Sequence, residues 1–230
     1  MNAIIDKRAS TKTVDALKNL GYNIIKTPQM SSVYDAISCH PDIMVGLLNF
    51  SQIVVEPTVY EYFKENLPDT KVLEGKSLLS SKYPYDIAYN CAFVGNNLFC
   101  NEQYTDEVIL NYCKKNNINI ININQGYAKC SICVVSDDAI ITGDKNIQIA
   151  ANRNNIDVLL IENKSIKLKG FEYGFIGGAT GKDKNKIFIN GNVRAHEDAD
   201  KLISFCKKHS KEVISLNDGL IEDIGSIFFI

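Results

Sequence analysis

The residues best suited to chemistry lie in short polar segments that lead into pairs of apolar runs. Cys130 follows Lys129, and a neighbouring ammonium can hold a cysteine as the reactive thiolate. His40 is followed two residues later by Asp42. The imidazole of His40 can transfer a proton, and the carboxylate of Asp42 can anchor a ligand. We therefore consider a catalytic site with Cys130 as nucleophile and His40 as its proton-transfer partner. The alternative is structural, with Cys130 as a small buried apolar side chain and His40 in a loop fixed by a proline.

Further polar residues are found at the corresponding points of the chain, where the other apolar pairs begin. Carboxylates there suit an amino or guanidino group, and a Gly-Gly pair leaves room for a ligand or lets backbone N–H groups approach it. A pocket with convergent polar groups is the default hypothesis for a binding site. The candidate ligand-binding residues are Asp42, Asp86, Asn90, Lys129, Ser131, Gly177, Gly178, Asp223 and Ser226.

Two motifs that suggest a metal or a nucleotide lack the required spacing. Cys130 and Cys133 would face opposite sides of a strand, and no second Cys or His pair has metal-ligand spacing, so we expect no metal. The run Gly177–Lys182 has the wrong spacing for a phosphate-binding loop, and Asp183 stands where Ser or Thr is needed. We therefore expect no cofactor.

The elements that must position these residues follow one repeated order of β-hairpin, helix and strand. Copies are predicted over residues 42–73, 86–123, 130–161 and 175–215. The spacing is 44 residues between successive members of the series Asp42, Asp86, Cys130 and Gly174. Such self-similarity at a fixed period is typical of a ring or an array of repeated units.

The two ends of the chain supply the parts of a fifth copy. A strand over 2–5, a helix over 11–20 and a strand over 23–27 are predicted at the start, and the chain finishes on an apolar strand over 225–230. Pairing the last strand with the first removes an exposed edge that would otherwise promote aggregation. We predict a single α/β domain over residues 1–230, a closed ring of five ββαβ units. The alternative is an open α/β sandwich with accidental spacing.

The composition limits the partners. The chain has 230 residues, 45 % of them hydrophobic, which is enough for a well-buried core. Its net charge of −2 lacks the basic footprint of a nucleic-acid or membrane-surface protein, and no apolar run reaches the roughly 20 residues of a membrane span. The first residues do not resemble a secretory signal, and the seven cysteines fit reduced thiols. We expect a cytoplasmic protein with a small-molecule ligand, no nucleic-acid partner and no membrane; the oligomeric state is not indicated.

The predicted ring resembles the pentein fold of the guanidino-group-modifying enzymes. The segments QGYAKCSICVV, GFIGGATGK and DIGSIFFI are similar to a bacterial branch of that superfamily whose function is unknown. The resemblance implies a site on the ring axis. In the enzymes a nucleophilic Cys begins the last strand, a general acid/base His begins the third hairpin, and carboxylates of the first two units hold the guanidinium.

Both catalytic positions of the enzymes are empty here. The last strand begins with Asp223-Ile224-Gly225-Ser226, and the third hairpin begins with Gly126-Tyr127-Ala128-Lys129. The resemblance therefore implies a ligand-binding ring rather than a hydrolase. An alternative is a cysteine-dependent amidino or amide hydrolase that uses Cys130 with His40 and either Asp42 or Asp223. A further alternative is a non-catalytic role with a macromolecular partner, as in the ribosome anti-association factor of the same fold, but the near-neutral charge disfavours RNA.

Overall fold

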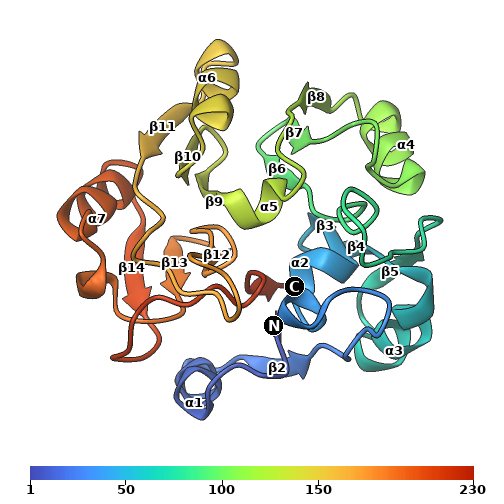
Figure 1. The fold of residues 1–230 in the computed structure, drawn as a ribbon, viewed down its shortest axis with the longest axis horizontal. Coiled ribbons are helices and arrows are strands. Elements are labelled where there is room, and N and C mark those ends of the chain that lie inside the picture. Colours follow the sequence, from blue (N-terminus) through green and yellow to red (C-terminus); the bar gives the residue numbers. More distant parts are fainter.

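Five three-stranded sheets surround a central axis in the computed structural model, which describes residues 1–230 (Figure 1). Each sheet pairs an inner strand antiparallel with a middle strand, which pairs parallel with an outer strand. The predicted ring of five ββαβ units is confirmed. The inner strands are β3 (Val45–Asn49), β6 (Ala92–Val94), β9 (Ile132–Ser136), β12 (Thr180–Asp183) and β15 (Phe228–Phe229). The middle strands are β4 (Gln52–Val55), β7 (Asn97–Cys100), β10 (Ala139–Thr142), β13 (Lys186–Ile189) and β1 (Asn2–Ile5). The outer strands are β5 (Lys71–Glu74), β8 (Asn119–Asn122), β11 (Asp157–Leu160), β14 (Glu212–Ser215) and β2 (Asn23–Lys26).

One helix per unit lies on the outside of the ring, and two short helical turns lie near its centre (Figure 1). No helix is long and apolar enough to cross a membrane. The outer helices are α1 (Thr11–Asn19), α3 (Tyr60–Asn66), α4 (Glu107–Lys115), α6 (Lys145–Arg153) and α7 (Ala199–Lys208). The central turns are α2 (Pro41–Met44) and α5 (Ala128–Ser131), and 3₁₀ turns span Asp35–Ile37, Pro57–Val59 and Val193–Ala195.

The ring closes where the two ends of the chain meet. β15 pairs antiparallel with β1, so that Ala3 lies opposite Phe229 and Ile4 opposite Phe228. Asn2 and Ile230 exchange backbone hydrogen bonds of 2.7 and 2.9 Å. The closure therefore gives the apolar last strand a partner that it would otherwise lack.

Local sequence signals explain where the outer helices begin. The Asp144 carboxylate accepts hydrogen bonds from the N–H groups of Asn146 and Ile147, and the Asp106 carboxylate accepts one from Val108. These N-cap residues satisfy backbone donors that the first turn of a helix leaves free. Each cap therefore fixes the point at which the chain leaves the sheet and turns into its covering helix.

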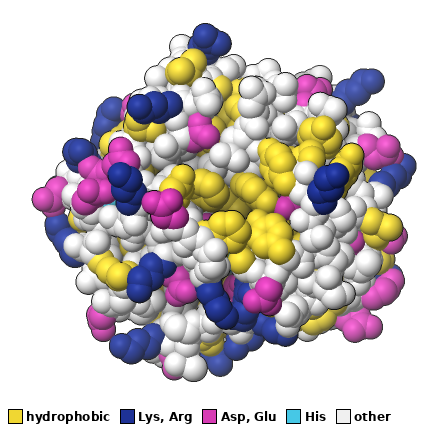
Figure 2. All heavy atoms as spheres, in the orientation of Figure 1, with side chains coloured by type: hydrophobic (Ala, Val, Ile, Leu, Met, Phe, Trp, Pro, Cys, Tyr) yellow, Lys and Arg dark blue, Asp and Glu magenta, His cyan; other side chains and the backbone are white.

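The core lies between each sheet and the helices that cover it. Four buried clusters run round the ring, the largest joining β3–β5 with the facing residues of α3 and α4. Phe63, Phe99 and Leu17 are completely buried, and burial of a side chain of this size contributes about 1.5–3 kcal/mol. Figure 2 shows charged side chains spread round the rim of the ring, while hydrophobic ones gather over the centre of the face drawn.

The segments that lead into the hairpins differ from the prediction. Strands were expected to begin at Asp42, Asp86 and Cys130, but Asp42 lies in α2, Asp86 in a turn before β6, and Cys130 in α5. The last strand is also shorter than predicted, because Gly225 and Ser226 have φ angles of +71° and +73°. This left-handed conformation turns the chain inward before β15 begins. These irregular segments carry most of the candidate site residues.

Candidate functional site

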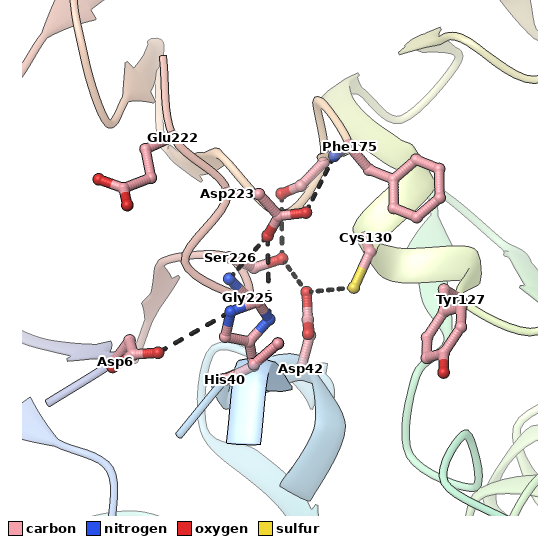
Figure 3. A network of polar contacts seen from close by, with 12 residues as sticks. Asp6, His40, Asp42, Tyr127, Cys130, Phe175, Glu222, Asp223, Gly225 and Ser226 are labelled. Atoms are coloured by element: carbon pink, nitrogen blue, oxygen red, sulfur yellow. Dashed lines mark hydrogen bonds and ion pairs between the residues drawn. The ribbon is translucent and has the colours of Figure 1, made fainter. Parts of the chain in front are cut away.

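A buried polar cluster fills the centre of the ring (Figure 3). The thiol of Cys130 in α5 donates to Asp42 Oδ2 in α2 over 3.2 Å. Asp42 Oδ2 also accepts from the hydroxyl of Ser226 over 2.6 Å. Asp42 and Ser226 are fully buried, and Cys130 is 4 % exposed. Residues from the first, third and fifth units therefore share one carboxylate oxygen at the axis.

Asn90 and Lys129 extend this cluster on either side. Asn90 Oδ1 accepts from the backbone N–H groups of Lys129 at 2.7 Å and Cys130 at 3.2 Å, and its amide donates to Cys130 Sγ over 3.1 Å. The Lys129 ammonium donates to Ser226 Oγ over 2.9 Å and to the carbonyl of Gly177 over 3.2 Å. The Lys129 ammonium therefore joins the cluster through Ser226 and Gly177.

His40 lies between two buried carboxylates (Figure 3). Its Nε2 is 3.9 Å from Asp6 Oδ2, and its Nδ1 is 3.9 Å from Asp223 Oδ1. Asp6 is also paired with Arg8 at 2.7 Å, whereas Asp223 accepts from the backbone N–H groups of Phe175 and Gly225. His40 Nδ1 is buried and has no hydrogen-bond partner. It is therefore available to a ligand or a water.

The Gly-Gly pair serves close packing at this centre. A Cβ atom at Gly178 would lie 2.0 Å from Asp223 Oδ1, and one at Gly177 would lie 2.2 Å from the carbonyl oxygen of Lys129. The N–H of Gly178 donates to the carbonyl of Cys130 over 2.8 Å. It is therefore occupied within the protein, and the expectation that it approaches a ligand is wrong for Gly178.

One cavity lies at each end of the axis. The smaller has a volume of about 220 Å³. The larger, of about 310 Å³, adjoins His40, Cys130 and Asp223. We call the larger one the aromatic cavity, because five aromatic side chains surround these three residues. Its remaining walls are aliphatic, and the exposed Glu172 lies at its edge. The aromatic residues are Tyr34, Tyr127, Phe171, Tyr173 and Phe175.

Asp86 reaches this cavity only through tyrosine hydroxyls. The Tyr127 hydroxyl donates to Asp86 Oδ2 over 2.6 Å and lies 3.0 Å from the Tyr34 hydroxyl. Asp86 Oδ1 is buried without a partner, and burial raises the pKa of this carboxyl. Asp86 is therefore a buried support of the cavity wall rather than a member of the central cluster.

Burial dominates the ionisation of the two groups that face the cavity. It raises the pKa of the Cys130 thiol well above its usual value, and the neighbouring carboxylates of Asp42 and Asp223 act in the same direction. Burial also raises the pKa of Asp223 to about 6, although nearby His40 lowers it. At neutral pH Cys130 is therefore a thiol, whereas Asp223 carries a negative charge.

The structure brings most of the predicted residues together at the axis. Nine of them lie round the central cluster, each within contact distance of at least one other. They are His40, Asp42, Asn90, Lys129, Cys130, Gly177, Gly178, Asp223 and Ser226. Ser131 does not join it, because its buried hydroxyl has no hydrogen-bond partner. No group of three or more His, Cys, Asp or Glu side chains is arranged to hold a metal ion.

Sequence reasoning missed the aromatic wall and the acid behind His40. Phe171, Tyr173 and Phe175 alternate in the glycine-flanked segment GFEYGF, a pattern that places successive aromatic rings on one side of an extended loop. Asp6 follows directly on β1, at the same end of the ring as the other site residues. The aromatic alternation is a detectable signal, but the loop's position over the axis is not.

The comparisons with known proteins agree with this architecture. A profile described as a family of unknown function (DUF6873) matches residues 4–228, so the chain belongs to that family. A search of curated proteins gives no match. Among solved structures, a dimethylarginine dimethylaminohydrolase variant from Pseudomonas aeruginosa complexed with citrulline has a TM-score of 0.57 and 8 % identity, covering 93 % of this chain and 91 % of that one.

Two other enzymes have the same overall fold. Agmatine deiminase from C. jejuni has a TM-score of 0.52 and 8 % identity over 93 % of this chain and 75 % of its own. An amidinotransferase of saxitoxin biosynthesis from Microseira wollei has a TM-score of 0.51 and 10 % identity over 93 % and 87 %. Identities this low establish the pentein-like fold and nothing about activity.

Proposed function

We propose that this protein binds a small cationic molecule, with an amino or guanidino group, in the aromatic cavity without transforming it. The observation that carries the proposal is the pairing of five aromatic walls with the buried carboxylate of Asp223. Aromatic faces attract cations, and the attraction strengthens where water is excluded. A desolvated carboxylate gives the same ligand a directional, charge-assisted hydrogen bond.

The polar atoms of the cavity suit a ligand with several N–H donors. Asp223 uses one backbone N–H on each oxygen, and a carboxylate can accept about four hydrogen bonds in all. The hydroxyls of Tyr34 and Tyr127 offer further acceptors on the opposite wall. A planar guanidino group or a primary amine would therefore be held at one end and stacked on aromatic rings along its length.

The absence of chemistry is supported by the state of the candidate nucleophile. The Cys130 thiol donates to Asp42, and its raised pKa keeps it protonated at neutral pH, whereas nucleophilic attack needs the thiolate. The resemblance to the guanidino-modifying enzymes supports the same view, because the stretches Asp223–Ser226 and Gly126–Lys129 lack the Cys and the His that it leads us to expect there. We therefore expect ligand binding rather than turnover.

Calorimetric titration with arginine, agmatine and dimethylarginine tests the proposal. Citrulline, whose ureido side chain carries no charge, is the matched comparison for the guanidinium of arginine. We expect at least one cation to bind, citrulline to bind about ten-fold more weakly or less, and Asp223→Asn to weaken the cation about ten-fold, the effect of one charge-assisted hydrogen bond. The exposed Asp218 gives the control Asp218→Asn, which should leave affinity unchanged. Equal binding of citrulline, or no binding of any cation, would contradict the proposal.

The hydrolase alternative, in which Cys130 acts with His40 and Asp42 or Asp223, makes a different prediction. Alkylation of each cysteine can be followed against pH by mass spectrometry, with Cys130→Ala as control. We expect Cys130 to be modified slowly at pH 7, with a rate that rises only well above the ordinary thiol pKa of about 8.5. Rapid modification at neutral pH would favour the hydrolase and require a screen of amidino and amide substrates.

A further inference from the structure

A second cavity lies at the opposite end of the ring axis. We call it the hairpin cavity, because the inner strands and their hairpin turns form its walls, including Phe50, Gly95 and Asp137. The aromatic cavity is formed instead by segments that precede the strands. The hairpin cavity has a volume of about 220 Å³, room for a small organic molecule where a liquid water takes about 30 Å³.

The walls of the hairpin cavity are mainly apolar. Leu47, Phe93, Val134, Ile227 and Phe228 line it, so all but one of the five inner strands contribute an apolar side chain. The remaining inner strand, β12, contributes Thr180, Gly181 and Lys182. The apolar part of a ligand would be buried against four of the five inner strands. Its burial favours binding in proportion to the apolar area removed from water.

Two lysine side chains give this apolar cavity a positive charge. Lys129 lines it and has its ammonium group 5.7 Å from the centre of the Phe228 ring, with no carboxylate within 4 Å. Lys182 is half-buried, and its nearest acid is the largely exposed Asp137 at 3.8 Å. Burial lowers the pKa of Lys182, a sign that its charge is incompletely compensated.

We propose that the hairpin cavity is a second binding site, for a small organic carboxylate with an apolar body. Its carboxylate would pair with the lysine ammonium groups while its hydrocarbon part packs against the inner strands. A cation is disfavoured by the two lysines, and a neutral molecule would leave the half-buried ammonium of Lys182 with the exposed Asp137 as its nearest acid. An inorganic anion has no hydrocarbon part that could pack against the apolar walls. A short-chain carboxylate meets both requirements.

This site is separate from the aromatic cavity in both position and chemistry. The central cluster of Cys130, Asp42 and Ser226 stands between them, and the side chain of Lys129 extends from it into the hairpin cavity. The aromatic cavity contains acids and no lysine, whereas the hairpin cavity contains lysines and one exposed acid. Binding of a carboxylate therefore neither requires nor follows from binding of a cation at the other end.

Titration of the protein with hexanoate, hexanamide and hexylamine tests the second site. We expect hexanoate to bind at least ten-fold more tightly than the other two, because only its carboxylate can form charge-assisted bonds to the lysines. Lys182→Met should weaken hexanoate about ten-fold, and Lys182→Arg should keep most of the affinity. The exposed Lys18 on α1 gives the matched control Lys18→Met, with no expected change.

A cavity-filling variant locates the site independently of charge. Val134→Trp places an indole in the hairpin cavity and should abolish hexanoate binding, while thermal unfolding verifies that the variant is folded. Equal affinity for hexanoate and hexanamide, or undiminished hexanoate binding in both Lys182→Met and a folded Val134→Trp, would overturn the proposal. So would the absence of hexanoate binding to the unmodified protein.

Discussion

The two ends of the ring axis are built from the same repeated units yet have opposite chemistry. At one end, short helical turns and loops place His40, Asp223 and aromatic side chains round a cavity. At the other end, regular inner strands and hairpin turns place Lys182 among apolar side chains, and α5 adds Lys129. The comparison teaches that a repeat constrains its strands, whose alternation fixes which residues face inward. The segments between repeats are free to diverge.

Asp42 belongs to the central cluster between the two cavities, and its substitution should have the largest effect on the free energy of unfolding. Asp42→Ala leaves the buried donors of Cys130 and Ser226 without their shared acceptor, so we expect a loss of about 3 kcal/mol in the free energy of unfolding. Urea denaturation measures it. Asp15→Ala, at an exposed site on α1, is the control and should change stability by less than about 0.5 kcal/mol.

A graded substitution guards this prediction against a variant that does not fold. Ser226→Ala removes one of the two donors but keeps the carboxylate, so its cost should be smaller than that of Asp42→Ala. If both substitutions cost less than 1 kcal/mol, the central cluster does not hold the ring together.

The pH dependence of cation binding should distinguish the acidic end from the basic one. Asp223, with a pKa raised to about 6, must lose its proton to pair with a cation, so affinity in the aromatic cavity should rise about ten-fold from pH 5 to pH 7. Asp223→Asn, whose amide does not titrate, should remove this rise. Calorimetry at both pH values is the measurement. An affinity that is constant with pH would contradict a role for Asp223.

The same shift has a consequence for stability with the opposite sign. Because the pKa of Asp223 in the folded state lies above its ordinary value of 3.8, the unfolded chain binds fewer protons in this range. The contribution of Asp223 therefore favours folding below pH 4 and is lost as the pH rises through 6. A bound cation should offset this loss, so its stabilising effect on thermal unfolding should be greater at pH 8 than at pH 5.

The smallest expected effect concerns the basic end without a ligand. Lys182→Met replaces a half-buried ammonium by an apolar side chain of similar length, so we expect the free energy of unfolding to rise by up to about 1 kcal/mol at pH 7. Chemical denaturation against the Lys18→Met control measures the change. A clear destabilisation would mean that the Lys182 ammonium is well compensated, and would weaken the contrast between the two ends.

Much of the ring could be predicted from the sequence because repeats leave a local record. The predicted strand over 2–5 coincides with β1, and the predicted helix over 11–20 extends one residue beyond α1. Alternating apolar residues, capping aspartates and turn residues act over a few positions, so a single chain displays them. Even the pairing of the chain ends followed from an apolar strand that lacked a partner.

The site was predicted as a set of residues but not as a geometry. Asp42, Asn90, Cys130 and Asp223 come from four units, and their convergence followed from the ring alone. What the sequence could not determine is that α5 turns Lys129 toward the hairpin cavity, or that the loop carrying Phe171 covers the axis. Likewise only burial in the folded chain sets the charges of Cys130 and Asp223. Side-chain direction in irregular segments and loss of solvent both depend on contacts between residues far apart in the chain, and these exist only in the tertiary structure.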